Sequence, residues 1–395
     1  MQLIQKMKTV LAAIIMISLT CSFIIFPSEA LHASSRGLHT WFEIVFPSLL
    51  PFFILAELLI GFGVVQFIGV MFEPFMRPLF RVPGVASFAW IVGMASGFPA
   101  GAKITATLRA NNHITKIEGE RLLAFSNAAS PLFLFGVIAV GFFHDEKIGL
   151  LLALSHYISN LVVGILMRFY HRNEKNRTSF RKDSFFVIRA LKQMHRTRLK
   201  ENRTTGELIG DAVHSSVQTL LIIGGYIILF SVLTHMLQLF TLFKQIMVAI
   251  VPAPLEEAIF PFISGLFEIT TGTELIAALD SVPLLYQLCM ISFILAFNSF
   301  SIQAQVATVI SKTDIRFLPY FSARLAHGLL AIVFCYIFYT IYDQHTNYFS
   351  RIVPTSMIEQ SYTYTIGLFF QSYGFYITFG MIFIAFLLQL RKIIR

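Results

Sequence analysis

The stretch Ser96-Gly-Phe-Pro-Ala-Gly-Ala-Lys-Ile104 places two glycines, a proline and a lysine inside a hydrophobic segment that runs from Ala86 to Ala110. Glycine and proline interrupt helices, and in lipid an interrupted backbone leaves N–H and C=O groups without partners. Such a break is stable only inside protein or beside a water-filled cavity. The stretch therefore indicates either a binding site or a plain kink that permits close helix packing.

The composition is typical of a polytopic membrane protein: the 395 residues are 56% hydrophobic and only 13% charged. The three cysteines lie far apart in apolar runs, without the spacing of a metal or redox site. Much of the net charge of +9 lies between Arg172 and Arg203, where eleven Lys or Arg occur with three acidic residues. This pattern predicts a cytosolic segment near anionic lipid, and no nucleic-acid module surrounds it.

Hydropathy predicts an all-α polytopic membrane protein with about eight transmembrane helices and two re-entrant hairpins. The helices are expected at about Thr9–Phe26, Trp41–Phe62, Arg121–Phe143, Ile148–Tyr170, Val213–Phe240, Leu284–Ile310, Leu318–Tyr342 and Ile366–Leu390. The hairpins are expected near residues 86–110 and 258–280, and Phe67–Pro83 is expected at the membrane interface. The first helix resembles a signal peptide, and the sequence leaves open whether it is cleaved.

The two halves of the chain repeat the same order of segments. At an offset of 171 residues, small or polar residues superpose in each segment: Gly101 on Gly272, Asn127 on Asn298, Ser130 on Ser301 and His156 on His327. Upstream, Ser96-Gly97 matches Ser264-Gly265 at an offset of 168, which predicts a three-residue insertion in the second break. A pair of broken segments at corresponding positions is the best sequence pointer to a transporter binding site.

The charge rule predicts that the two repeats have opposite orientations. When the spans are followed from a cytosolic N-terminus, the basic segment and the C-terminus fall in the cytosol, and the hairpins enter from opposite faces. An inverted repeat of this kind binds substrate near the midplane in secondary transporters. The chain then divides into a first helix with an external linker (1–40), the first repeat (41–170), a basic cytosolic loop (171–207), the second repeat (208–342), and an external linker with a last helix (343–395).

Three motifs resemble those of the nucleoside-recognition or gate-domain membrane proteins, and most closely the sporulation integral membrane protein family called YlbJ or SpoVV. They are Ser96-Gly-Phe-Pro-Ala-Gly-Ala-Lys103, Ser126-Asn-Ala-Ala-Ser130 and Phe297-Asn-Ser-Phe-Ser301. The resemblance implies a multi-pass protein of the outer forespore membrane that moves dipicolinate, pyridine-2,6-dicarboxylate, from the mother cell during endospore formation. The sequence also looks distantly like concentrative nucleoside transporters, although Phe98-Pro99-Ala100 departs from their polar first hairpin.

The candidate substrate-binding residues are small, polar or cationic and lie in or next to the breaks: Ser96, Gly97, Gly101, Lys103, Asn127, Ser130, Asn298 and Ser301. Lys103 would hold an anion, or it would snorkel to the cytosolic surface or pair with a carboxylate such as Glu274, its repeat equivalent. Asn and Ser three residues apart are expected on one helix face. The second hairpin offers groups for a coupling cation or proton, or for helix capping: Glu268, Thr270, Thr271, Thr273 and Glu274.

No hydrolase, metalloprotease or phosphate-loop motif occurs, so we expect no enzyme, no cofactor and no metal site. The expected partners are a small organic anion and the lipid bilayer, with no nucleic acid. A homo-oligomer is left open, and the coupling ion is not identified. Two alternatives remain: a transporter of nucleosides or another small organic anion, and a sporulation membrane scaffold that does not transport.

Overall fold

The computed structural model describes residues 2–172, 186–200, 203–239 and 256–352, and every regular element in these ranges is helical. Four of the described helices are long and apolar enough to cross a membrane: Glu146–Met167, Thr205–Leu237, Leu284–Ile310 and Phe317–Asp343. A bent pair, Met16–Ile25 and Pro27–Glu43, makes five if it is counted as one span. The expected all-α membrane protein is therefore confirmed, whereas the expected span Ile366–Leu390 lies outside the described residues.

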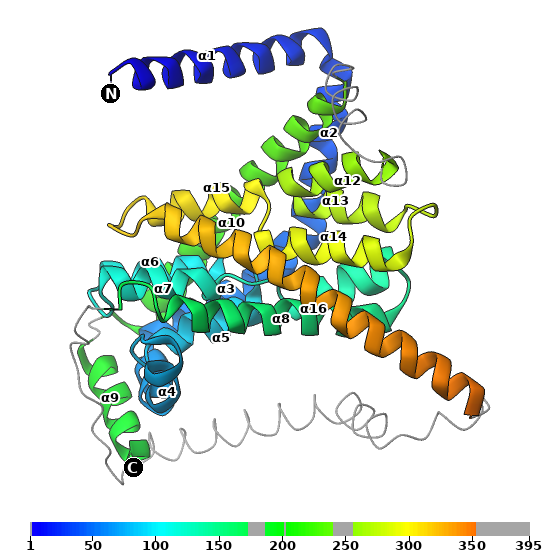
Figure 1. Cartoon of the computed structure of the whole chain (residues 1–395). Helices are drawn as coiled ribbons and strands as arrows, with labels where there is room; N and C mark the ends of the chain where they lie inside the picture. The colour runs from blue at the N-terminus through cyan, green and yellow to red at the C-terminus, as the bar shows by residue number, and fades with distance from the viewer. Residues whose placement is uncertain (1, 173–185, 201–202, 240–255, 353–395) are drawn as a thin grey trace. The chain divides into compact units, whose positions relative to one another are not determined.

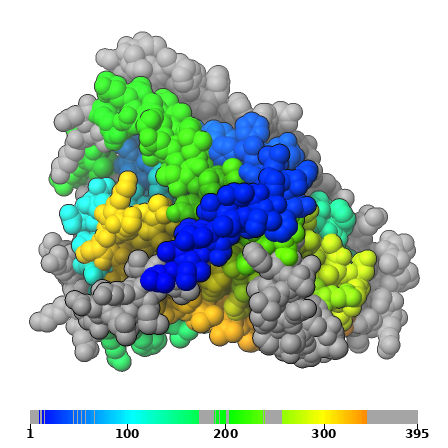
Figure 2. Space-filling model, turned by 90° about the horizontal axis from the view of Figure 1, so that it is seen from above, coloured from blue at the N-terminus to red at the C-terminus, as the bar shows by residue number. Residues whose placement is uncertain are grey.

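The chain divides into two compact units, Met1–Phe338 and Tyr339–Arg395. The candidate functional site lies in the first unit. Its N-terminal helices are α1 (Gln2–Ile25), α2 (Pro27–His39), the π-helix η1 (Thr40–Val45) and α3 (Phe46–Gly61). Figure 2 shows α1, in dark blue, on the outer surface, where its apolar side chains such as Ile14 and Ile17 are exposed. An exposed apolar helix of this kind fits contact with lipid.

The long helix α10 (Thr205–Leu239) packs along α2 and α3, as Figure 1 also shows. A Cβ on Gly224 of α10 would lie 2.6 Å from the Trp41 ring, so only glycine allows this contact. The Trp41 indole N–H also donates to the Leu220 carbonyl at 2.9 Å. Residues 27–39, which were expected as part of a linker, are therefore helical and held against α10.

The first broken segment is a helical hairpin of α5 (Ala86–Ser96) and α6 (Ala100–Ala110). Gly97 ends α5 with a φ of 88°, a conformation that favours glycine, and Pro99 cannot donate an N–H to continue the helix. The two helices come together where a Cβ on Gly93 would lie 2.9 Å from the Cα of Gly101. The sequence thus places the break correctly.

The segment after this hairpin is broken too, which the sequence analysis did not predict. The helix α7 (Lys116–Ser126) ends before the π-helix η2 (Leu132–Phe142), and α8 (Glu146–Met167) follows. The continuous span expected at Arg121–Phe143 is therefore wrong. Pro131 gives the physical reason, because proline disfavours a helical conformation at the preceding residue and cannot donate a backbone hydrogen bond.

The second half follows the same order. Its helices are α12 (Glu256–Phe267), α13 (Ile269–Ala277), α14 (Leu284–Phe297), α15 (Phe300–Ile310) and α16 (Phe317–Ile352). The tip of the α12–α13 hairpin is Glu268, which lies 171 residues after Gly97, the tip of the first hairpin. The loop between the two helices has three residues in the first hairpin and one in the second, so the predicted three-residue insertion is wrong.

Candidate functional site

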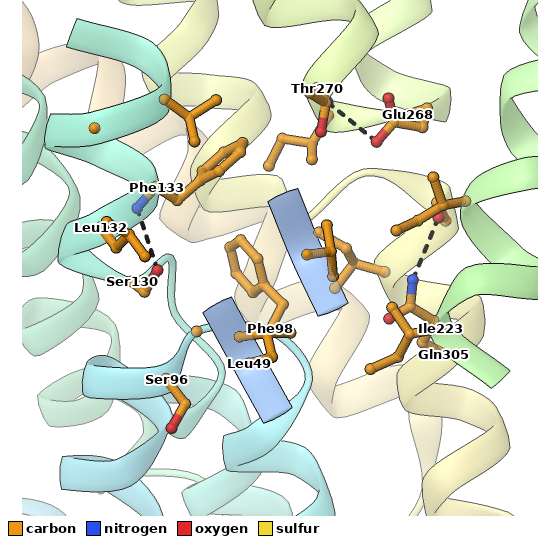
Figure 3. Close-up of a pocket in the computed structure, with 18 of the residues that line it drawn as sticks. Leu49, Ser96, Phe98, Ser130, Leu132, Phe133, Ile223, Glu268, Thr270 and Gln305 are labelled. Carbon is orange, nitrogen blue, oxygen red and sulfur yellow. Dashed lines mark hydrogen bonds between the residues drawn. The ribbon is translucent and has the colours of Figure 1, made fainter. Parts of the chain in front are cut away.

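A cavity of about 370 Å³ lies where the breaks of both halves come together. Figure 3 shows the Phe98 ring between Ser130 and Phe133 on one side and Ile223 and Gln305 on the other. The lining residues next to the breaks are Ser96, Gly97, Phe98, Ser130, Leu132, Phe133, Glu268, Ile269, Thr270, Ser301, Ile302 and Gln305. Aliphatic side chains from α3 and α10, such as Leu49 and Ile223, complete the wall.

Four helices, α6, η2, α13 and α15, begin at or next to this cavity. Backbone N–H groups and the positive end of the helix dipole lie at a helix N-terminus, so such ends favour anionic groups. Among the described residues that line the cavity, Glu43 and Glu268 are acidic and none is Lys or Arg. The positive groups at this cavity are therefore helix ends and not cationic side chains, and the Glu268 carboxylate already caps the end of α13.

Glu268 is buried at the tip of the second hairpin, with 3% of its surface exposed. Its carboxylate accepts hydrogen bonds from the backbone N–H groups of Thr270 at 3.1 Å and Thr271 at 2.7 Å, and so caps α13. Within the described residues no cation pairs with it. Thr273 is buried and donates to the Ile269 carbonyl, whereas Glu274 is exposed. Glu268 and Thr270 line the cavity, and the other three candidate residues of this hairpin do not.

Lys103 lies outside the cavity, in an ion pair with a carboxylate that the sequence analysis had not paired with it. Its ammonium nitrogen is 2.8 Å from Glu57 Oε1 on α3 and 3.1 Å from Ser215 Oγ on α10, and it lies over the Phe53 ring. The alternative that Lys103 pairs with a carboxylate is therefore borne out, although the partner is Glu57 and not Glu274. This cluster joins the first hairpin to the α3 and α10 helices, because each helix supplies one polar member.

Gly101 acts in packing and does not line the cavity. A Cβ on Gly101 would lie 1.8 Å from the carbonyl oxygen of Ser126, and a Cβ on Gly93 would lie 1.9 Å from the same oxygen. The last carbonyl of α7 therefore sits between two glycines of the first hairpin. In the second half, a Cβ on Gly272 would lie 2.0 Å from the Cα of Gly265, so glycine again permits backbone contact.

Asn127 and Asn298 are fully buried behind the cavity and meet at one tyrosine. Their side-chain amides donate to the Tyr320 hydroxyl at 3.1 and 2.9 Å, and Asn298 also donates to the Asn127 carbonyl at 3.2 Å. Asn127 is extended and Asn298 is left-handed, so neither sits on a helix face with the serine three residues later. The one-face interpretation is wrong because both asparagines lie at helix ends.

Arg324 is a fully buried cation that caps the C-terminal end of α7. It donates to the carbonyl oxygens of Asn127 at 3.1 Å and of Ala124, and to Asn160 Oδ1 at 3.1 Å. Within the described residues no carboxylate pairs with it. The last carbonyls of a helix carry partial negative charge, so this helix end supplies acceptors and a favourable field for the guanidinium.

Two side chains of α8 hold the peptide groups of Ala129, next to the cavity residue Ser130. The Ala129 N–H donates to His156 Nε2 at 3.0 Å, and the Tyr157 hydroxyl donates to the Ala129 carbonyl at 3.0 Å. His327 Nε2 in turn donates to the His156 carbonyl at 3.0 Å. The histidines thus fix the backbone of the break, which satisfies polar groups that lipid could not.

Two charge pairs join the end of the first hairpin and α7 to the loop between α15 and α16. Arg109 donates to Asp314 through Nε and Nη2, at 2.7 and 2.9 Å, and Arg316 donates to Glu120 through the same two nitrogens, at 2.8 and 3.0 Å. Bidentate guanidinium–carboxylate pairs are directional and hold groups in register. The Arg109 hydrogen bond lowers the pKa of the Asp314 carboxyl below its usual value. These pairs close one end of the contact between the two halves.

The apolar members of the site, Phe98, Leu132 and Phe133, were not predicted, because apolar residues are common throughout a membrane protein. Gln305, whose amide lies 3.4 Å from Ser301 Oγ, was not predicted either. The sequence did contain a signal for Gln305, since this residue follows Ser301 by four positions and so shares its helix face.

Two comparisons with known proteins give a match. Residues 42–144 match the family model described as Gate, nucleoside recognition, which covers the first hairpin and the break after it. The chain is 50% identical over 339 residues to the sporulation integral membrane protein YlbJ of Bacillus subtilis strain 168, across 84% of this chain and 83% of the relative. No solved structure matches. The chain therefore belongs to the family of the sporulation integral membrane protein YlbJ.

Proposed function

We propose that this protein is a transporter whose substrate binds in the cavity between the two broken hairpins. The observation that carries the proposal is that four helix ends from both halves of the chain converge on one cavity. Its volume of about 370 Å³ is within the range of small-molecule sites. Broken helices that meet around a cavity are the substrate-binding arrangement of secondary transporters.

The repeat that such a mechanism needs is supported by contacts between equivalent residues. Asn298 donates to the carbonyl of Asn127, and His327 donates to the carbonyl of His156, and each pair is separated by 171 residues. Equivalent residues of two repeats related by a two-fold axis come into contact only near that axis. Together with the charge rule, these contacts favour an inverted repeat in a protein of about eight spans, with hairpins that enter from opposite faces.

We propose dipicolinate as the substrate, moved from the mother cell across the outer forespore membrane. Helix N-termini suit carboxylates, and the Phe98 and Phe133 side chains supply an apolar wall for a planar aromatic ring. The similarity to a sporulation integral membrane protein supports a role in endospore formation. Because the Glu268 carboxylate would repel a dianion, we propose that a coupling cation or proton at Glu268 accompanies the substrate, and no chemical change of the substrate is required.

Nucleosides are the second candidate substrate. Glu268, Thr270, Ser301 and Gln305 offer donors and acceptors suited to a neutral sugar and base, and the matching family model is described as nucleoside recognition. A scaffold without transport is the remaining alternative, but a scaffold would have no use for a cavity at four helix ends.

Binding to the detergent-solubilised full chain separates these candidates. We expect dipicolinate to raise the melting temperature, uridine to have little effect, and Phe98→Ala to reduce the dipicolinate shift. Ser311→Ala, at an exposed end of α15, is the matched control and should leave the shift unchanged. A shift with uridine alone would favour the nucleoside, and no shift with either compound would contradict a substrate site in this cavity.

A further inference from the structure

The helix α9 (Phe186–Lys200) carries aliphatic and cationic side chains together on its outer face. Ile188, Leu191 and Leu199 are exposed by 61%, 48% and 68%. Lys192, His195 and Arg196 are exposed beside them. These six positions follow the three- and four-residue spacing that places residues on one side of a helix. The exposed face of α9 is therefore apolar and basic at once.

The opposite side of α9 is fixed to the protein. Ala190 is fully buried, and a Cβ on Gly63 would lie 2.7 Å from the carbonyl oxygen of Met194 and 3.0 Å from the Thr197 side chain. The Arg198 guanidinium lies 5.4 Å from the centre of the Phe62 ring. The turn between α3 and α4 (Val64–Phe80) thus contacts the backbone of α9, so packing sets the orientation of the outer face of α9.

The neighbouring helix α4 (Val64–Phe80), which lies beside α9 in Figure 1, has an exposed apolar row of its own. Phe72, Phe75 and Leu79 are exposed by 37%, 61% and 42%, while Met76 and Phe80 are buried in the core. The spacing of three and four residues again places the exposed side chains on one face. Two adjoining helices therefore present exposed apolar rows, and α9 also presents basic side chains beside its row.

We propose that the outer faces of α9 and α4 form an interface with the head-group layer of an anionic bilayer leaflet. Helices that mix aliphatic and cationic side chains bind at this depth, because the aliphatic groups enter the acyl boundary and the cations meet anionic phosphates. The segment Arg172–Arg203 carries eleven Lys or Arg and three acids, which gives charge complementarity to such a surface. The span α10 begins only five residues after α9 ends, so α9 is tethered close to the membrane plane.

The proposal is independent of the transported substrate and is tested by the depth of α9. Full-length protein with its three cysteines replaced by alanine carries a nitroxide at Leu199→Cys, or at Lys312→Cys as the aqueous control, since Lys312 is exposed in the α15–α16 loop. Both variants are placed in nanodiscs of phosphatidylcholine, with or without phosphatidylglycerol. Collisions of the nitroxide with oxygen and with a water-soluble nickel complex report its depth.

The nitroxide at position 199 is expected to favour oxygen over nickel several-fold more than the nitroxide at position 312, and this preference should rise with phosphatidylglycerol. Lys192→Gln with Arg196→Gln should remove the dependence on phosphatidylglycerol without changing melting temperature. Equal nickel access at positions 199 and 312 in both lipids would overturn the proposal. Displacement of the position-199 nitroxide from the bilayer by added polyuridylate would overturn it in favour of a nucleic-acid surface.

Discussion

Substitution of Gly101 by alanine should damage the first hairpin severely, because the added methyl group has no space. Its Cβ would lie 1.8 Å from the Ser126 carbonyl oxygen, whereas real Cβ contacts are essentially never under 3.0 Å. The α6 backbone would have to move away by more than about 1 Å. Since the obstacle is backbone and not a flexible side chain, the displacement would reach the break that lines the cavity.

The expected cost is at the upper end of the overpacking range, about 3 kcal/mol. At roughly 2 °C for each kcal/mol in a chain of this size, the melting temperature should fall by about 6 °C. Alanine otherwise stabilises helices over glycine by about 0.5–1 kcal/mol, so the steric term must exceed that gain. Gly272→Ala, the equivalent change in the second hairpin, should behave in the same way because its Cβ would lie 2.0 Å from Gly265.

The assay is thermal unfolding of the detergent-solubilised chain, followed by fluorescence-detected size exclusion. Gly225→Ala is the matched control, because Gly225 lies exposed in α10 with nothing within 4 Å of an added Cβ. The control should melt at or slightly above the wild-type temperature. If Gly101→Ala has the same melting temperature as Gly225→Ala, the close contact between the first hairpin and the end of α7 is refuted.

Three further changes follow from the charge contacts, each measured as a melting temperature. Lys103→Met should lose about 2 kcal/mol by leaving Glu57 without its cation. Adding Glu57→Gln should restore much of that loss, and no recovery would argue against the pair. Arg324→Leu should lose about 3 kcal/mol because the carbonyls at the end of α7 lose their donor, with Arg324→Lys intermediate; a neutral result for leucine would contradict the capping role. Asp314→Asn should cost about 1 kcal/mol at pH 7. Since Arg109 lowers the pKa of Asp314, this contribution is present above the ordinary carboxyl pKa of about 4 and is lost as pH falls through the lowered value. A constant difference from wild type down to about pH 3 would refute the assignment.

The sequence was sufficient to locate the first hairpin tip, because the conformations available to glycine and proline are local properties. Gly97 and Pro99 end one helix and prevent its continuation without help from distant residues. The predicted offset of 171 residues also relates Asn127 to Asn298, and these two residues are in contact. Their contact could not have been predicted from spacing alone.

Long-range pairings were the part that the sequence could not determine. Glu57 and Ser215 reach Lys103 from helices far away in the chain, and Tyr320 reaches across to Asn127. Any of several membrane-buried polar residues could have filled these places. The break before Pro131 did have a local signal, the proline itself. The apolar character of the surrounding residues hid that signal.

Uptake into sealed proteoliposomes tests the proposed transport most directly. Labelled dipicolinate should accumulate in vesicles that contain the wild-type protein, with saturation and with inhibition by unlabelled dipicolinate, and accumulation should respond to an imposed proton gradient. Glu268→Gln should remove that response to the gradient. Uptake no faster than in protein-free vesicles, with the protein folded and inserted, would contradict the proposed transport of dipicolinate.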